Sequence, residues 1–290
     1  MPKDRYRAYH VERAKGGVAM TMTAGSAAVS KDSPPVFNNI LAYRDEVVPW
    51  IRELTDALHE HGCAAMIQLT HLGRRTNWNK GDWLPSISAG PDREPAHRAF
   101  PKMMEDWDIE RVIEDYATAA ERMQAGGMDG IEIQAYGHLM DQFWSPLTNK
   151  LSGPYGADTL ENRLRFTTDV LAAVRRRVGP EFIVGIRYTA DEVQEIAEWA
   201  LEHGIWIISD EIYQNLVYDG VRAASIAEAT PALERLSIWG NALTSLPTSL
   251  QKCVGLVGVQ AQENHLATIP DGAWPDGLET IFLQDQKDVP

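Results

Sequence analysis

The sequence lacks the features that mark secreted, membrane-spanning and metal-binding proteins. It has only two cysteines among its 290 residues, Cys63 and Cys253, too few for a disulfide framework and without metal-ligand spacing. No apolar run approaches the roughly 20 residues that span a bilayer, and the first ten residues are mostly polar. We therefore expect a protein of the reducing cytoplasm, with no membrane partner and no metal site.

Basic residues are also scarce, and they are scarcest in the last third of the chain. The net charge is -14, and an acidic surface repels phosphates, which argues against a nucleic-acid partner. Residues 1–190 hold 25 acidic and 23 basic side chains, a balance of -2, whereas residues 191–290 hold 16 and 4, a balance of -12. This change in composition predicts a domain boundary near Asp191.

Short apolar runs alternate with amphipathic segments over the first 187 residues. Apolar strands that alternate with helices of this kind form parallel βα units whose sheet is covered on both faces. A barrel and a doubly wound sheet both satisfy the pattern. The expected strands are 18–22, 63–70, 131–133 and 182–186, and helices are expected over 4–15, 47–58, 109–123 and 160–174, the third of them capped by Asp108.

Polar side chains follow three successive expected strands, and their placement favours the barrel. His71 and Arg74 come after the second strand, Tyr136 and His138 after the third, and Arg187 after the fourth. They converge on one mouth only if the strands form a ring. A glycine-rich dinucleotide fingerprint follows none of the strands. We therefore predict an α/β fold that begins as a partial (β/α)8 TIM-type barrel.

Four segments of the first 190 residues carry recognisable motifs: IQLTHLGR at 67–74, MDGIEIQAYGHLMDQFWSPLTNK at 128–150, LENRLRF at 160–166 and FIVGIR at 182–187. Together they resemble the old yellow enzyme family of FMN-dependent oxidoreductases, and most closely its branch of amine demethylases and dienoyl reductases. The resemblance implies an eight-stranded barrel with FMN over its C-terminal mouth and NAD(P)H as reductant. It also implies hydride transfer between flavin N5 and a small molecule, either an enone or an N-methyl amine.

The same resemblance implies which residues hold the flavin. Gln68 would hydrogen-bond the pyrimidine edge, and Arg187 would place positive charge near flavin N1 and O2. Thr23 and Ala24 would line the edge of the ring. The strands that cradle the FMN phosphate in this family are not found after Arg187, so we expect weak FMN retention or none.

The resemblance further implies a substrate side of the site. Tyr136 falls where the family carries the second member of a substrate-binding pair, and His138 falls where many members place a tyrosine proton donor. Such groups polarise a carbonyl or deliver a proton opposite the hydride, so these two are the candidate catalytic residues. His71 and Arg74 would bind substrate. An open barrel has unpaired strand edges, which predicts either homo-oligomerisation or coverage of the edge.

Residues 191–231 resemble a different family, the fold-type I aminotransferases. The match is DEVQEIAEWALEHGIWIISDEIYQNLVYDG, in which Asp210 and Tyr213 would contact pyridoxal phosphate. The downstream segment ERLSIWGNALTS has no lysine for a Schiff base, so we expect no pyridoxal phosphate chemistry. As a helix and a strand, this αβ segment would complete part of the barrel.

Residues 232–290 carry an internal repeat that resembles leucine-rich repeats. Leu233, Leu236, Ile238 and Asn241 recur at offsets of 23 and then 22 residues, although the third copy has glutamine in place of the asparagine. The resemblance implies a short solenoid whose surface binds a protein partner. The alternative to the enzyme is therefore a chimeric, non-catalytic interaction protein.

Overall fold

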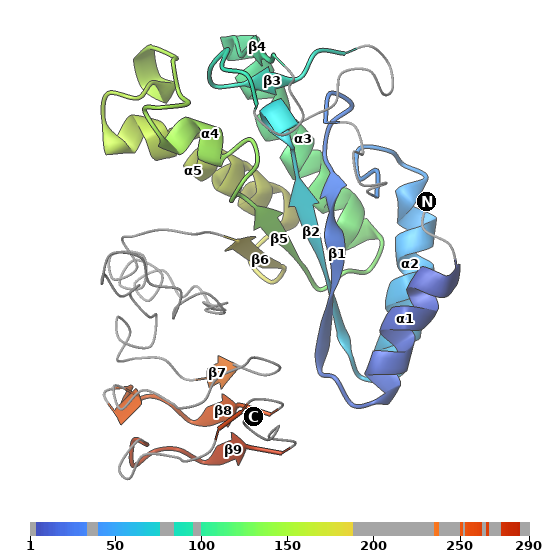
Figure 1. Cartoon of the computed structure of the whole chain (residues 1–290). Coiled ribbons are helices and arrows are strands. Elements are labelled where there is room, and N and C mark those ends of the chain that lie inside the picture. The colour runs from blue at the N-terminus through green and yellow to red at the C-terminus, as the bar shows by residue number, and fades with distance from the viewer. Residues whose placement is uncertain are drawn as a thin grey trace. The chain divides into compact units, whose positions relative to one another are not determined.

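The computed structural model of the chain forms two compact units, Met1–Tyr188 and Thr189–Pro290 (Figure 1). They are described separately below. The segment 191–231, with Asp210 and Tyr213, lies outside the residues that the structure describes. Those residues are 4–33, 40–75, 84–94, 100–187, 235–237, 250–251, 253–262, 265–266 and 274–284.

The first unit is built on a four-stranded parallel sheet with the order β1-β2-β5-β6 (Figure 1). Each strand of this sheet is added beside the one before it, always at the same edge. A barrel requires this order, whereas a doubly wound sheet reverses its order at a switch point. The strands are β1 Met20–Ala28, β2 Ala64–Thr70, β5 Gly130–Gln134 and β6 Ile183–Arg187.

The helices of this unit cover the sheet through their apolar stripes. Helices α2 and α3 contact β2, α3 also contacts β5, and α5 contacts β6 and packs along α3. Of the apolar stripe predicted for residues 47–58, Val47, Ile51, Leu54 and Leu58 are fully buried in α2, whereas Val48 is only partly buried. The helices are α1 Asp4–Lys15, α2 Val47–His59, α3 Asp106–Ala125 and α5 Leu160–Val178.

Helix α3 begins at Asp106, three residues earlier than the sequence pattern indicated. Asp108 lies inside its first turn instead of preceding it, so the prediction of Asp108 as the residue before the helix is wrong. The carboxylate still caps the helix, because its Oδ2 accepts a hydrogen bond from the backbone N–H of Glu105 at 2.9 Å. The helix ends at Ala125, and Gly127, two residues later, has a left-handed φ of 87°.

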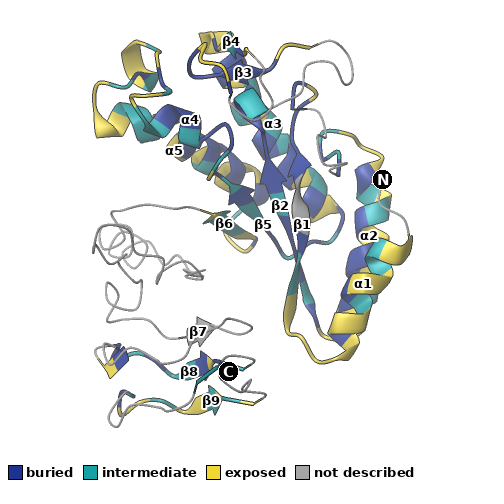
Figure 2. Ribbon diagram, in the orientation of Figure 1, coloured by how far each residue is buried: buried dark blue, intermediate teal, exposed yellow. Residues whose placement is uncertain are grey.

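The two faces of the sheet differ in polarity. Ile67 and Ile131, on the helix-covered face, are fully buried, whereas their neighbours Gln68 and Glu132 are only half-buried (Figure 2). Successive side chains of a strand point to opposite faces, so the polar residues share the face away from the helices. This polar face is the side on which a barrel encloses its interior.

Short elements that the sequence pattern did not predict occupy the connections after β2 and β5. Strands β3 and β4 form a two-stranded parallel pair within the proline-rich connection, and the other three are single helical turns. The elements are η1 Gly73–Arg75, β3 Ile87–Ser88, β4 Lys102–Met103, α4 Asp141–Trp144 and η2 Gly153–Tyr155.

The second unit contains a three-stranded parallel sheet, β7-β8-β9, with strands Arg235–Ser237, Gly258–Gln260 and Thr280–Phe282. Leu236 is the register partner of Val259, which in turn pairs with Ile281. Equivalent positions of the sequence repeat therefore lie side by side. A small apolar core of Leu250, Cys253, Leu256, Val259 and Ala261 supports the middle strand.

The described part of the chain has neither a membrane-spanning helix nor a cluster of metal-ligating side chains. None of its helices is both long and apolar enough to cross a bilayer. Across the same ranges, no three or more histidine, cysteine, aspartate or glutamate side chains are grouped as a metal ion would need.

Candidate active site

The polar residues predicted for the site gather at one end of the sheet, because parallel strands bring their carboxyl ends together. Gln134 at the end of β5 is the register partner of Arg187 at the end of β6. The backbone N–H of Tyr136 donates to the Arg187 carbonyl at 3.4 Å. The structure thus brings Tyr136 and Arg187 to neighbouring strand ends, with Gln68 two strands from Arg187 in the same sheet.

A row of polar side chains crosses the open face of the sheet below this end. Gln68 and Glu132 are register partners, and Gln68 Nε2 donates to Glu132 Oε2 at 2.5 Å. Two residues after Glu132 in β5, Gln134 Nε2 donates to the Tyr136 carbonyl at 2.9 Å. Among the described residues, Gln134 Oε1 is buried and has no hydrogen-bond partner. A buried acceptor of this kind calls for a donor that the described chain does not supply.

This donor set fits the pyrimidine edge of a flavin, which presents two carbonyl acceptors and one N–H donor. Gln68 and Arg187 supply donors, and Gln134 Oε1 supplies a free acceptor. Arg187 is exposed at the end of its strand. The residues present are therefore chemically suited to FMN, and Gln134 is a candidate that the sequence motifs did not indicate. An unsatisfied amide oxygen is visible only once its neighbours are placed.

Thr23 does not share the polar face. It is buried and is the register partner of Ile67, so its side chain lies on the helix-covered side of β1. Two residues earlier, Thr21 Oγ1 is 2.8 Å from His10 Nδ1 in helix α1. A contact between Thr23 and a flavin would therefore use its backbone. Ala24 lies within β1, and its side chain is outside the described part of the structure.

His138 is a buried histidine that points back to β2. Its Nδ1 lies 2.5 Å from Thr70 Oγ1, and the residue is 8% exposed. Burial, together with the nearby charges of Arg75 and His71, lowers the pKa of His138 to about 4. The imidazole is therefore neutral at neutral pH. Tyr136 differs from it, since that residue is 53% exposed.

Asp141 is a functional candidate that the sequence reasoning missed. Its Oδ2 accepts a hydrogen bond from the backbone N–H of Gly137, whose φ of 73° is left-handed. Burial raises the pKa of Asp141 to about 6, against the opposing effects of the Gly137 N–H and the charges of Arg74 and Arg75. The available signal was an acidic residue inside the motif that contains Tyr136 and His138. Its proton affinity follows from its burial, which the motif does not report.

The predicted substrate-binding residues have different surroundings. His71 is fully buried, its Nε2 lies 3.0 Å from Asp32 Oδ1, and its Nδ1 accepts from the Gly73 N–H at 3.0 Å. Both ring nitrogens are therefore engaged within the chain. Arg74 is half-buried, and its backbone N–H donates to Gln142 Oε1 at 3.2 Å. Of the two side chains, only that of Arg74 has solvent-accessible surface.

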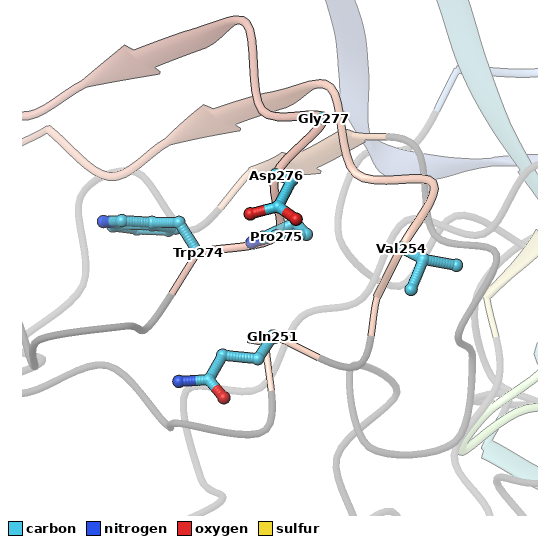
Figure 3. Close-up of a pocket in the computed structure, with 6 residues that line it drawn as sticks. All are labelled: Gln251, Val254, Trp274, Pro275, Asp276 and Gly277. Atoms are coloured by element: carbon cyan, nitrogen blue, oxygen red, sulfur yellow. The ribbon is translucent and has the colours of Figure 1, made fainter.

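A separate pocket lies in the second unit (Figure 3). Trp274, Pro275 and Asp276 lie along one side of it, and Gln251 lies opposite them (Figure 3). Trp274 is half-buried and packs against the small core under β8. The pocket includes none of the predicted site residues.

The strand order and the polar strand ends of the first unit are those of the first part of a TIM-type barrel. The chain matches the model of the NADH:flavin oxidoreductase / NADH oxidase family over residues 1–237, and it belongs to that family. The family resemblance predicted from the four motifs is thus confirmed.

Two curated relatives share the N-terminal part of the chain. It is 74% identical to a probable N-methylproline demethylase of Rhizobium meliloti (strain 1021) over 192 residues. It is 47% identical to a multifunctional alkene reductase/demethylase of Caballeronia cordobensis over 191 residues. Each match covers 66% of this chain but only 28% of the relative. The chain therefore corresponds to a little over a quarter of these proteins.

Solved structures agree on the fold. An old yellow enzyme homologue from Zymomonas mobilis matches 64% of this chain and 54% of its own with a TM-score of 0.59 at 24% identity. Morphinone reductase matches 90% of this chain and 72% of its own with a TM-score of 0.63 at 21% identity. These likenesses confirm an α/β TIM-type barrel. The aminotransferase and leucine-rich-repeat resemblances remain predictions.

Proposed function

We propose that the first unit carries the flavin- and substrate-facing part of an FMN-dependent oxidoreductase of old yellow enzyme type, acting on an N-methyl amine. The observation that carries the proposal is the neutral, buried imidazole of His138 at the strand mouth. The relatives named as demethylases support it. Gln68, Gln134 and Arg187 are assigned to the flavin pyrimidine edge.

The chemistry of amine oxidation explains why a neutral histidine suits this site. When bound, FMN supplies the two-electron acceptor that takes hydride from the N-methyl carbon. An alkylammonium ion has no lone pair to stabilise the resulting iminium, so the substrate reacts as the free amine. His138 has a pKa of about 4, so its imidazole stays neutral and can hydrogen-bond the free amine without placing a positive charge beside it. Glu132, half-buried on the same face, favours a cationic substrate.

Enone reduction is the second candidate, and the exposed Tyr136 favours it. The phenolic hydroxyl is a donor that can polarise a carbonyl, and one relative is named as both an alkene reductase and a demethylase. In this direction NAD(P)H is the reductant. Arg74 is assigned to the substrate side in both reactions, and Thr23 and Ala24 to the flavin rim through the β1 backbone.

The two reactions are separated by an anaerobic experiment on the whole chain supplied with FMN. N-methylproline should bleach the oxidised flavin spectrum, and His138→Ala should slow the bleaching by about tenfold, the loss expected for one hydrogen bond of roughly 1.4 kcal/mol to the substrate. His61→Ala, a change at an exposed histidine, is the matched control. If only 2-cyclohexenone reoxidises the reduced flavin and the amine leaves the spectrum unchanged, the amine assignment is wrong.

We also propose three segments within the chain: a partial barrel over 1–190, an αβ segment over 191–231 and a leucine-rich-repeat solenoid over 232–290. The solenoid is supported by the register of β7, β8 and β9, whose central residues Leu236, Val259 and Ile281 repeat at the sequence offsets of 23 and 22. A protein partner on this sheet is part of the proposal. The two buried free thiols support a cytoplasmic location.

A further inference from the structure

We propose that Asp32 and Arg111 are positioning residues that act through His71 to hold the loop 71–75 against the loop that carries His138. Neither residue lies in the sequence motifs of the site, and neither is on the polar face of the sheet. The catalytic consequence rests on the proposed function, whereas the hydrogen-bond relay itself does not. The relay runs from helix α3 through the loop after β1 to the strand mouth.

The hydrogen bonds around His71 identify its tautomer. The Gly73 backbone N–H can only donate, and it lies 3.0 Å from His71 Nδ1. Nδ1 therefore carries the lone pair, and the ring proton is on Nε2. The Nε2–H group donates to Asp32 Oδ1, and the distance from Nε2 to Oδ1 is 3.0 Å. Because the imidazole is fully buried, the carboxylate and the Gly73 amide together determine its orientation.

Asp32 is kept as a permanent acceptor by Arg111. The carboxylate is 7% exposed, and its Oδ2 pairs with Arg111 Nη2. Burial alone would raise the pKa of Asp32, but the hydrogen bond from His71 and the charge and hydrogen bond of Arg111 lower it to about 2. Asp115 Oδ2 lies 2.9 Å from Arg111 Nη1 and fixes the guanidinium from within α3.

The loop after β2 is joined to the same support at two more points. The His71 backbone N–H donates to Tyr116 Oη at 2.9 Å, and the Leu72 N–H donates to Ser33 Oγ at 2.9 Å. Tyr116 is a fully buried residue of α3. Helix α3 and the loop after β1 therefore hold this loop through both its backbone and its histidine.

The loop in turn holds the segment that contains His138. The Leu139 N–H donates to the His71 carbonyl at 2.9 Å, and Arg75 Nη1 donates to the Gly137 carbonyl at 3.0 Å. These bonds flank His138, whose Nδ1 meets Thr70 at the end of β2. Displacement of His71 would therefore move both backbone neighbours of His138.

The relay is tested by NMR on the whole chain without flavin, with 15N-labelled histidine. We expect the His71 ring to show the tautomer protonated at Nε2. In Asp32→Ala the tautomers should mix, and hydrogen exchange at the Gly73 amide should rise by about tenfold or more relative to Ile131 in the sheet core. Normalising to Ile131 separates local loosening from a general loss of stability.

Two further variants complete the test. Arg122→Gln breaks an ion pair of the same helix, Arg122 Nε with Asp45 Oδ1 at 2.7 Å, and should leave His71 and Gly73 unchanged. Asp32→Asn retains an acceptor oxygen, so it should keep the Nε2 tautomer and show a smaller rise in exchange. If Asp32→Ala does not fold, the exchange rate of the Gly73 amide in Asp32→Asn provides the test.

The inference is overturned if wild-type His71 is protonated at Nδ1, or if Gly73 exchanges equally in the Asp32 variants and in Arg122→Gln. A flavin titration on the same samples keeps the two proposals apart. If the wild type does not bind FMN in this titration, the proposed function is contradicted and the relay is unaffected. Normal FMN binding with an unchanged Gly73 in Asp32→Ala would contradict the relay alone.

Discussion

At the scale of single residues, the strand mouth holds two ionisable groups whose pKa values are shifted so that both favour their neutral forms. His138 has its pKa lowered to about 4 and Asp141 has its pKa raised to about 6, and burial is the first cause of each. They lie three residues apart in one loop. The environment there is thus of low polarity, which suits a step in which a charged substrate amine becomes neutral.

Asp141 should make the fold less stable at neutral pH than at acid pH. Its unfolded pKa is about 3.9, so as pH rises the unfolded state ionises first, and the cost grows from pH 4 until it levels off above about 6. Asp141→Asn keeps an oxygen for the Gly137 N–H and removes this cost. We expect a gain of about 1–2 kcal/mol at pH 7.5.

Thermal melts at pH 4 and pH 7.5 measure this gain, which should vanish at the lower pH. Asp158→Asn, at an exposed aspartate, is the control and should change neither melt. A gain of equal size at both pH values would show that the ionisation of Asp141 is not its source.

Asp32 should have the opposite pH dependence. Its folded pKa of about 2 is below the unfolded value of about 3.9, so its contribution is present above pH 4 and is lost as pH falls toward 2. Asp32→Asn should lower the free energy of unfolding by about 2 kcal/mol at pH 7. Urea denaturation followed by circular dichroism measures it. A deficit as large at pH 2.5 as at pH 7 would contradict this account.

At the scale of elements, the loops after β2 and β5 approach so closely that one position requires glycine. A Cβ on Gly73 would lie 2.5 Å from Gln142 Oε1, and its φ of 58° is left-handed. A Cβ on Gly17 would have nothing within 4 Å, so alanine at that position would be opposed only by the left-handed φ of 91°. Gly73→Ala should therefore cost about 1 kcal/mol more than Gly17→Ala.

Thermal unfolding of the two alanine variants measures that difference. The double variant Gly73→Ala with Gln142→Ala removes the obstructing amide, so the additional cost of Gly73→Ala should be smaller in the Gln142→Ala background. If the two glycine variants are equally stable, the close approach contributes nothing beyond backbone strain.

The pattern of elements was largely predictable from the sequence, but their connections were not. Helices α2 and α5 have one long apolar face, and the strands β2, β5 and β6 are short apolar runs, so local periodicity located them. The turn α4 and the pair β3-β4 are too short to show a period. They form because neighbouring elements supply their partners, as when the Leu139 N–H reaches the His71 carbonyl.

At the scale of the whole molecule, the open question is whether the chain retains a flavin. Weak FMN retention is a prediction of the sequence analysis, and its direct test is the contribution of the phosphate to binding. We expect a colourless protein after purification. In titrations followed by flavin fluorescence, FMN and lumiflavin, which lacks the phosphate, should bind with affinities within about threefold, less than 1 kcal/mol.

Bovine serum albumin at the same concentration provides the control for non-specific quenching. A stoichiometric flavin absorption band in the purified chain would contradict the expectation of weak retention. It would show that residues elsewhere in the chain replace the missing phosphate site.

The sequence by itself determined the family, the alternation of strands and helices, and the strand ends at which Gln68, His138 and Arg187 lie. These follow from local periodicity and from motifs that are contiguous in the chain. Only the tertiary structure decided that Thr23 turns to the helix side and that His71 faces Asp32, 39 residues away. Side-chain direction and proton affinity depend on partners that folding brings together, and a linear motif carries no record of them.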